Sequence, residues 1–186
     1  MAIIQNGSSL FTGDAGSGSS EIRRYIIEND RLEAIIQLPT DLFYNTGIAT
    51  YIWIVDGKNA KPLNRLGKVQ LIDASKCYVK RRKNIGNKRV DLDDKCIALI
   101  VKAYNEFKEK EDVEGDISVE SKILDDADFG YTKVTVETAQ VDSNGNKILK
   151  KGKPVAEKGK TDTETIPLKE DIEEYFKKNV LPYNLN

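Results

Sequence analysis

Two adjacent aromatic residues, Phe43 and Tyr44, lie in a segment with the composition of a turn, because Asn45, Thr46 and Gly47 follow them directly. An aromatic ring at the carboxyl edge of an α/β sheet can stack against a flat ligand such as a nucleobase. It can equally close the end of the sheet, because aromatic side chains serve both purposes. The residue types alone therefore leave both interpretations open.

A basic segment, KRRKNIGNKR, is the second candidate for chemistry. Contacts from such residues to nucleic-acid phosphates set affinity without carrying sequence information. Taken alone, the segment is interpreted as a solvated loop, with phosphate contact as the alternative. Its cations are Lys80, Arg81, Arg82, Lys83, Lys88 and Arg89.

Two further features have weaker chemical meaning. The glycine- and serine-rich segment Gly13–Ser20 precedes an expected helix, where phosphate-binding loops occur. No lysine follows its glycines and its spacing is not GxGxxG, so it is interpreted as a flexible connection with an anion site as the alternative. Asp14, Asp41 and Asp73 lie near expected strand ends, where α/β enzymes place catalytic groups. Nothing in the sequence pairs these carboxylates, and Asp73 can simply cap the residues after it.

The composition excludes several classes of site. The chain of 186 residues contains no histidine, so a Ser-His-Asp or Cys-His triad is excluded. Its two cysteines, Cys77 and Cys96, form no CxxC motif, so we expect no metal site and no disulfide framework, and a reducing cytoplasm is the expected location. A formal net charge of −1 argues against a generally basic nucleic-acid binder. No apolar run approaches the ~20 residues of a membrane span.

The first 80 residues predict alternating strands and a helix. AIIQN, then a helix in EIRRYIIEND, then LEAIIQLP form a strand–helix–strand unit, which predicts parallel strands joined by a right-handed crossover. The uncharged run IATYIWIV predicts a strand buried on both faces. The loop before it is too short for a crossover helix, so this strand is expected to run antiparallel. KVQLIDAS is a fourth expected strand. One crossover helix cannot cover both faces of such a sheet, so we expect half of a doubly wound sheet to lie outside this sequence.

The remaining residues predict a helix-rich region. DLDDKCIALIVKAYNEFKE predicts an amphipathic helix with Asp91 as its N-cap. EKEDVEGD is expected to be a charged connection, and FGYTKVTVETA a half-exposed strand. The polar segment from Asp142 to Glu164 is expected to be a turn followed by a flexible loop. IPLKEDIEEYFKKNVLP predicts a terminal amphipathic helix with Pro167 near its start.

The sequence also resembles a known family. AIIQNGSSLFTGDAGSGSSEIRRYIIENDRLEAIIQLPTDLFYNTGIATYIWIV is similar to the carboxyl half of the catalytic domain in modification (M) subunits of type I restriction–modification systems, and LPTDLFYNTGIATYIW is its most diagnostic part. The resemblance continues more loosely through DASK, KRRKNIGNKR and FGYTKVTVE to PLKEDIEEYFKKNVLPY. These subunits are DNA N6-adenine methyltransferases.

The resemblance implies an S-adenosylmethionine-dependent, Rossmann-like fold that flips adenine out of duplex DNA. It also implies two partner proteins, a specificity subunit and a restriction subunit. The family's target-base loop corresponds here to Phe43, Tyr44, Asn45, Thr46 and Gly47, and the basic segment to DNA-backbone contacts. Neither the family's glycine-rich cofactor motif nor its Asn-Pro-Pro-aromatic tetrapeptide occurs in this sequence. We therefore expect a carboxyl-terminal piece with Met1 as an added start, with no catalytic or cofactor-binding residues, no bound S-adenosylmethionine and no activity by itself.

The expected fold class is α/β, with the carboxyl half of a methyltransferase sheet followed by a mainly helical appendage that includes a small hairpin. The expected divisions are residues 1–79 for the half-domain, 80–115 for the basic loop and amphipathic helix, and 116–186 for the appendage. The terminal helix is expected to contact the specificity subunit. The alternative function is a stand-alone, non-catalytic binding or assembly module that dimerises through its exposed sheet edge. The fragment itself is expected to self-associate through the same edge.

Overall fold

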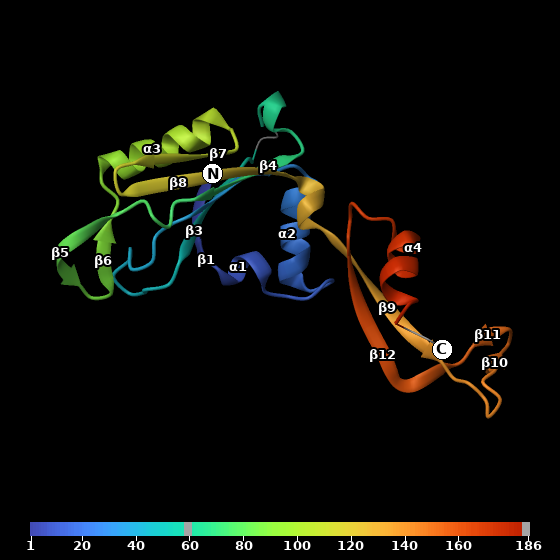
Figure 1. Cartoon of the computed structure of the whole chain (residues 1–186). Coiled ribbons are helices and arrows are strands. Elements are labelled where there is room, and N and C mark those ends of the chain that lie inside the picture. Colours follow the sequence, from blue (N-terminus) through green and yellow to red (C-terminus); the bar gives the residue numbers. More distant parts are fainter. Residues whose placement is uncertain (58–60, 184–186) are drawn as a thin grey trace. The chain divides into compact units, whose positions relative to one another are not determined.

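The computed structural model describes residues 1–57 and 61–183, which form two compact units (Figure 1). Unit 1 runs from Met1 to Asp126, and unit 2 begins at Ala127. Each unit has its own strands and its own buried apolar side chains. In the described part of the chain, no helix is both long and apolar enough to cross a membrane.

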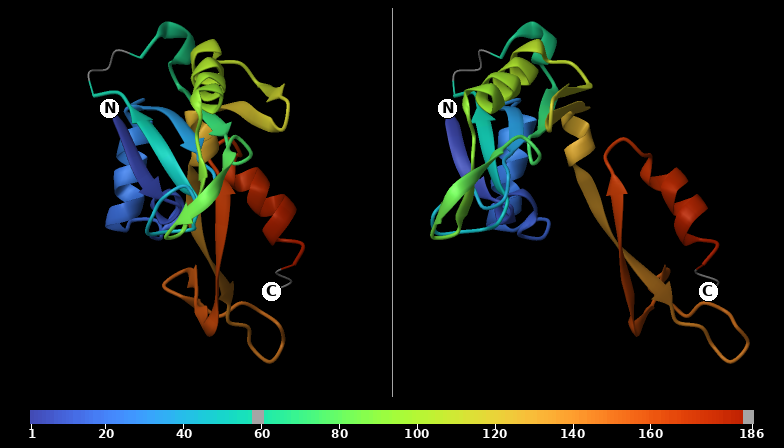
Figure 2. Two further views of the ribbon diagram at one scale, coloured as in Figure 1. Left: turned by 90° about the vertical axis from the view of Figure 1, so that its left-hand side faces the viewer. Right: turned by 60° about the vertical axis from the view of Figure 1, so that its left-hand side comes forward.

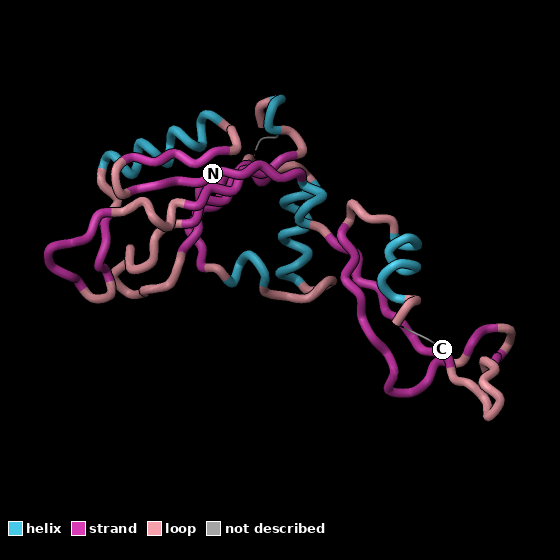
Figure 3. Tube along the Cα trace, viewed as in Figure 1, coloured by secondary structure: helices cyan, strands magenta, loops and turns pink. Residues whose placement is uncertain are grey.

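Unit 1 is built on a six-stranded mixed sheet with the strand order β1-β3-β2-β4-β8-β7. Only the β2–β4 pair is parallel among these neighbours, and each of the others is antiparallel. The strands of this sheet are β1 (Ala2–Asn6), β2 (Leu32–Gln37), β3 (Thr50–Val55), β4 (Lys68–Asp73), β7 (Lys110–Glu114) and β8 (Ile117–Asp125). Figure 3 shows these strands in magenta, with helices on either side.

The predicted parallel direction of the first two strands is confirmed. β1 and β2 are both antiparallel to β3, so they run in the same direction with β3 between them. β3 departs from the expectation of burial on both faces, because only Thr50, Trp53 and Val55 of its residues are buried. Ile48 precedes the strand and is 56% exposed. The pleat gives each face only alternate residues, and one face of β3 is only partly covered.

The helices of unit 1 lie on opposite faces of the sheet (Figure 2). α3 (Asp94–Glu106) packs its buried residues against the face that carries Ile36, Ile52 and Ile72. Alternate residues such as Trp53 face the other side, which lies beside α2. The remaining helical elements of unit 1 are α1 (Ser8–Phe11), α2 (Gly18–Glu28) and the 3-10 turn η1 (Leu63–Arg65).

The amphipathic helix was predicted correctly, but its N-cap was not. Asp93, rather than Asp91, caps α3, because its Oδ1 accepts the backbone N–H of Cys96 at 2.9 Å. Asp91 is instead the last residue of β6 (Lys88–Asp91). The sequence DLDD offers three aspartates within one turn, and strand pairing takes the first of them out of the helix.

Two segments expected to be loops form β-hairpins. The basic segment forms β5 (Val79–Ile85) and β6, which are antiparallel and turn at Gly86, where φ is +59°. The charged connection forms β7 and its turn to β8, with Gly115 at φ +61°. Residues of β5 are mostly exposed, so its sequence lacks the apolar–polar alternation from which a strand is predicted.

Unit 2 is a long β-ribbon with one short helical segment. β9 (Tyr131–Ala139) pairs antiparallel with β12 (Ala156–Pro167). The buried apolar residues in the described part of unit 2 are Val136, Ile166 and Val180. The other elements, including the 3-10 turn at the junction of the units, are η2 (Asp126–Phe129), β10 (Leu149–Lys150), β11 (Lys153–Pro154), α4 (Ile172–Tyr175) and the π turn Phe176–Val180.

This unit differs from the expected helical appendage. The polar segment expected to be a flexible loop forms β10, β11 and most of β12. Pro167 is the last residue of β12, and the terminal helix begins only at Ile172, with Asp171 as its N-cap. Alternating threonines in KTDTETI favour a strand, but the residues between them are also polar, so the segment shows no apolar–polar alternation. β8, from the segment expected to belong with the appendage, lies in the sheet of unit 1 beside β4.

Candidate functional site

Three connecting segments leave the same edge of the sheet in unit 1. The pairs Asn6↔Thr50, Gln37↔Tyr51 and Gln37↔Asp73 place the carboxyl ends of β1, β2 and β4 next to one another. The segments that leave these ends are Gly7 with α1, the loop of residues 38–49, and the residues between β4 and β5. Ligand sites of open α/β sheets lie at this edge.

The loop of residues 38–49 is closed at its base and held in a defined turn. The N–H of Leu38 donates to Thr50 O at 2.8 Å, and that of Asp41 to Gly47 O at 3.4 Å. Asp41 has a φ of +56°, which a non-glycine residue rarely adopts. A Cβ added at Gly47 would lie 2.6 Å from Asp41 Oδ1, which is the end of a side chain that can rotate away.

The two rings of this loop have different surroundings. Phe43 is partly buried and packs against the core cluster below α3, next to the buried Leu42. Tyr44 is 56% exposed. Phe43 is thus packed against the core, whereas Tyr44 leaves much of its side chain exposed to solvent.

The β5–β6 hairpin contacts this loop through backbone atoms. Asn87 N donates to Tyr44 O at 3.0 Å, and Arg89 N donates to Asp41 O at 2.8 Å. A Cβ at Gly86 would lie 2.7 Å from Tyr44 O, so only glycine permits the turn of the hairpin to approach so closely. In Figures 1 and 3 the hairpin and the loop lie side by side. The hairpin therefore supports the aromatic loop from outside.

The cations of the hairpin divide into two groups. Lys88 Nζ lies 5.4 Å from the centre of the Tyr44 ring, within cation–π range, and 2.9 Å from Asp91 Oδ1. Arg81 contacts the same carboxylate, with 2.6 Å between Nη1 and Asp91 Oδ2. The hydrogen bond from Lys88, together with Arg81, holds the pKa of Asp91 below its ordinary value. The second group is exposed to solvent and comprises Lys80, Arg82, Lys83 and Arg89.

The structure thus places Lys88 beside Tyr44, with Arg81 on the same Asp91 carboxylate as Lys88. Arg89 reaches the loop through its backbone N–H, which donates to Asp41 O. The sequence interpretation missed Asp91 as the carboxylate that positions two cations, because it assigned this residue to a helix cap. One signal for the hairpin was available. NIGN between two segments rich in lysine and arginine is typical of a tight turn between strands.

The remaining predicted positions have structural roles. Arg23 in α2 holds the glycine- and serine-rich segment through its Nη1, which donates to Thr12 O at 2.7 Å, while Ser17 caps α2. Asp73 Oδ1 accepts the backbone N–H of Ser75 at 2.8 Å, which is the capping role considered for it. Asp14 Oδ1 accepts the N–H of Ala15. None of these contacts forms a pair of carboxylates.

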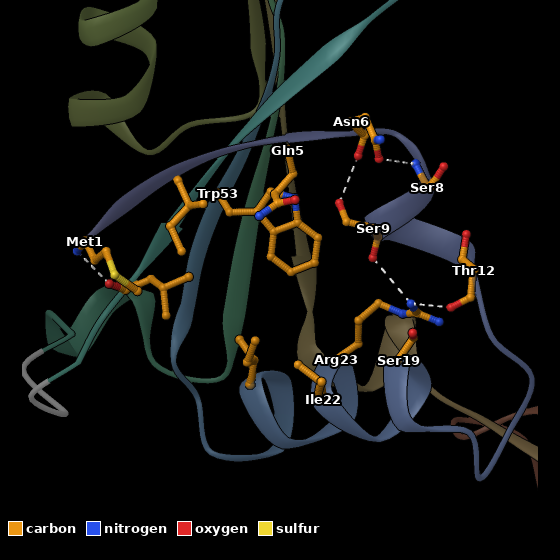
Figure 4. Close-up of a pocket in the computed structure, with 13 residues that line it drawn as sticks. Met1, Gln5, Asn6, Ser8, Ser9, Thr12, Ser19, Ile22, Arg23 and Trp53 are labelled. Atoms are coloured by element: carbon orange, nitrogen blue, oxygen red, sulfur yellow. Dashed lines mark hydrogen bonds between the residues drawn. The ribbon is translucent and has the colours of Figure 1, made fainter.

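A cavity of about 560 Å³ lies beside this segment, between β1, β3 and the two helices α1 and α2 (Figure 4). Apolar side chains form its floor, including Ile22 and Trp53. Arg23 also lines it, and this guanidinium donates to the carbonyls of Ser9 and Thr12, as the dashed lines show. No carboxylate is among the described residues that line it, so the cavity is not suited to acid–base chemistry.

The two cysteines are buried and unreactive. Cys77 and Cys96 are free thiols, and Cys77 Sγ donates to Cys96 O at 3.7 Å. Burial raises the pKa of Cys77 to about 12, which suppresses the thiolate form that reacts or binds metals. Across residues 1–57 and 61–183, no group of three or more histidine, cysteine, aspartate or glutamate side chains could hold a metal ion.

Comparisons with known proteins decide the family. A family model described as N-6 DNA Methylase matches residues 1–144. The chain belongs to the N-6 DNA methylase family. It is 33% identical over 164 residues to the Type I restriction enzyme MjaIX methylase subunit of Methanocaldococcus jannaschii, a match that covers 87% of this chain and 25% of the relative. The MjaVIII methylase subunit of the same organism is 38% identical over 113 residues, which are 61% of this chain and 18% of that relative.

A solved structure agrees with this N-6 DNA methylase assignment. The type I restriction-modification system methyltransferase subunit from Streptococcus thermophilus matches with a TM-score of 0.53 and 26% identity, over 68% of this chain and 22% of that chain. The resemblance inferred from the sequence is therefore confirmed. The chain spans about a quarter or less of the length of these relatives.

Proposed function

We propose that this chain forms the target-base side of the active site in the methylase subunit of a type I restriction enzyme that methylates adenine N6 in DNA. The exposed Tyr44 ring, held on a closed turn at the carboxyl edge of the sheet, is the observation that carries this proposal. Family membership and the names of the relatives support it. A fragment of this length contributes a wall of that site and not the whole of it.

The chemistry of the target explains the need for such a ring. An amino group of adenine is inaccessible to a methyl donor while the base is stacked in duplex DNA, so the base must be extruded. Stacking on an aromatic side chain contributes ~1–3 kcal/mol per base, which offsets part of the cost of extrusion. Tyr44 has the exposed face for this contact, while Phe43 anchors the loop to the core. Asn45, Thr46 and Gly47 shape the turn between them.

The basic hairpin has the position and charge to hold the DNA backbone beside an extruded base. Lys80, Arg82, Lys83 and Arg89 expose their side chains, so they can reach phosphates without first breaking a buried contact. Arg81 and Lys88 are positioned by Asp91 and define the inner side of this surface. The hairpin and the loop are hydrogen-bonded together, so backbone and base contacts would share one rigid support.

The described residues do not form a site that fits S-adenosylmethionine. The cavity beside Trp53 has no carboxylate to accept hydrogen bonds from ribose hydroxyls, and its arginine is occupied by backbone carbonyls. The methyl donor and the adenine amine would then be held by other parts of the longer subunit.

The specificity and restriction subunits remain the proposed partners of the assembled enzyme. The carboxyl-terminal segment offers one surface for the specificity subunit, because Leu168, Ile172, Leu181 and Tyr183 are all exposed there. Leu181 and Tyr183 follow the buried Val180, which anchors the segment to unit 2. Exposed apolar side chains beside an anchored residue are typical of an interaction surface.

The test uses the methylase subunit that carries this sequence, assembled with its specificity subunit. Tyr44→Ala is expected to lower adenine methylation by about 100-fold or more without lowering the melting temperature, since stacking and positioning are lost together. Tyr44→Phe keeps the ring and is the matched control, expected to retain most activity. Methylation by Tyr44→Ala at the level of Tyr44→Phe would contradict the proposal.

A second candidate is an assembly module that self-associates through β1. Within the described residues β1 pairs with β3 alone, and Ile4 on this edge strand is 54% exposed. Unpaired strand edges invite pairing with another chain. Sedimentation equilibrium of the 186-residue chain distinguishes the candidates. A dimer that Ile4→Lys converts to monomer supports self-association, whereas a monomeric chain excludes it.

A further inference from the structure

The tip of the ribbon in unit 2 concentrates positive charge in a chain whose net charge is −1. Between Gln140 and Lys160 there are six lysines against two carboxylates, and all six lysines are exposed. They lie beyond residue 144, where the family match ends. The lysines are Lys147, Lys150, Lys151, Lys153, Lys158 and Lys160. This feature is therefore separate from the loop and hairpin of unit 1.

Both carboxylates of the tip are already occupied. Asp142 Oδ1 accepts the backbone N–H groups of Asn144 and Asn146, each at 2.8 Å, and these bonds lower the pKa of Asp142. Glu157 contacts Lys160 at 3.0 Å between Oε2 and Nζ. In the described part of the chain, the other five lysines of the tip have no acidic partner within ion-pair distance. Their charge is available to an external anion.

The tip is a hydrogen-bonded structure. Ile148 N donates to Gln140 O at 2.8 Å and Val155 N donates to Ile148 O at 2.9 Å, so Ile148 joins the two sides of the ribbon. β10 and β11 then pair antiparallel around a turn at Lys151 and Gly152, which have φ values of +53° and +77°. The lysines therefore occupy defined positions.

One of these positions is electrostatically unfavourable in the free chain. Lys150 and Lys153 are direct cross-strand partners. Directly opposed like charges in an antiparallel pair destabilise the hairpin. Lys151, between them, adds a third positive charge at the same turn, in a left-handed conformation that lysine rarely adopts. A polyanion that lies across the turn would remove this repulsion.

We propose that the ribbon tip binds the phosphate backbone of duplex DNA through Lys150, Lys151 and Lys153, as a second contact that extends the DNA binding proposed above. This inference rests on the proposed function for the identity of the polyanion. The major groove accepts a two-stranded β-ribbon, and lysines act there as point charges toward phosphates. Such contacts are independent of base sequence.

The test measures binding of the 186-residue chain to a labelled duplex of arbitrary sequence by fluorescence anisotropy from 50 to 300 mM salt, conditions chosen to resolve the salt slope. The tip variant combines Lys150→Gln, Lys151→Asn and Lys153→Gln, with Asn chosen for the left-handed position. The control variant combines Lys95→Gln, Lys108→Gln and Lys122→Gln, which are exposed in unit 1 and remove the same charge. Thermal unfolding of both variants verifies the fold.

The tip variant is expected to weaken binding at least about 10-fold near 0.1 M salt and to reduce the log–log salt slope by about 2 to 3, because about 0.9 is lost per phosphate contact. The control variant should change neither by a comparable amount. Equal losses in both variants would overturn the inference, as would an unchanged slope in the tip variant or no DNA binding by the unsubstituted chain. The inference would also be overturned if the tip lysines bound an acidic protein while the tip variant bound DNA as tightly as the unsubstituted chain.

A third variant separates this inference from the proposed function. It combines Arg82→Gln, Lys83→Gln and Arg89→Gln in the β5–β6 hairpin. Loss of binding in this variant alone would support the DNA surface of unit 1 and refute the ribbon contact. Loss in the tip variant alone would support the ribbon contact and refute the hairpin as a phosphate surface.

Discussion

Gly86 is the position where the support of the aromatic loop can be tested most directly. It has a φ of +59°, and a Cβ there would lie 2.7 Å from Tyr44 O, a backbone atom that cannot rotate away. Alanine at this position therefore has two costs. The left-handed conformation costs ~1 kcal/mol for a residue with a Cβ. Relief of the contact requires the hairpin turn to move away from the loop.

That movement stretches the hydrogen bond from Asn87 N to Tyr44 O, which is 3.0 Å long. Loss of such a bond contributes ~1 kcal/mol, and partial loss of packing adds to it. Gly115 supplies a matched control, because its φ is +61° and nothing lies within 4 Å of an added Cβ. Gly86→Ala should therefore destabilise unit 1 by ~1–2 kcal/mol more than Gly115→Ala, since only the first substitution breaks the contact.

Urea unfolding followed by the fluorescence of Trp53, the single tryptophan of the chain, measures this difference in unit 1. The midpoint for Gly86→Ala is expected ~0.5–1 M below that for Gly115→Ala, given the usual dependence of stability on urea. Gly86→Ala should also impair adenine methylation in the assembled enzyme, and Gly115→Ala should not. Equal midpoints for the two variants would refute the argument that the hairpin supports the loop through this contact.

Three further predictions follow from contacts described above. Phe43→Ala should lower the free energy of unfolding of unit 1 by ~1.5–3 kcal/mol, because it removes partly buried packing. Tyr44→Ala should change this free energy by no more than ~0.5 kcal/mol, because its side chain is exposed. Equal urea midpoints for the two variants would contradict the different burial of the two rings. Cys77 has a pKa raised to about 12, so its buried thiol favours folding most at low pH, and stability should fall as pH rises from 9 toward 12. Between pH 9 and 12 the free energy of unfolding of Cys77→Ala should fall less steeply than that of the unsubstituted chain. Parallel curves for the two proteins would contradict this prediction. Leu181→Ser with Tyr183→Ser should weaken co-purification of the specificity subunit, and full recovery would exclude this surface.

The strands β1 to β4 of unit 1 could be predicted, because the apolar side chains of their segments reflect their burial in the sheet. Trp53 and its neighbours, or Ile36 and Ile72, are apolar at positions that the sheet covers, so the pattern and the structure agree. β5 and β12 could not be predicted in this way. Their residues are mostly exposed, and they form strands through backbone pairing to β6 and β9, which leaves no apolar alternation in the sequence.

The site was predictable in its residues but not in its arrangement. The sequence indicated Tyr44 and the basic segment separately. Their proximity depends on Arg89 N and Asn87 N donating to the carbonyls of Asp41 and Tyr44, which are contacts between backbone atoms that residue types do not encode. The separate exposure of Phe43 and Tyr44 likewise follows from the turn geometry at Asp41, not from the chemistry of the two rings.

The backbone hydrogen bonds between the hairpin and the loop also bear on how such a site can change. The donors and acceptors are peptide groups, and they remain in place when most neighbouring side chains are exchanged. Substitution at Tyr44, Asn45 or Lys88 would then alter the surface offered to a ligand while the loop kept its position. Gly86 is tied to that geometry, because its φ is +59° and an added Cβ would meet a backbone oxygen. Libraries that randomise the exposed residues and retain Gly86 should therefore yield folded proteins with new ligand preferences.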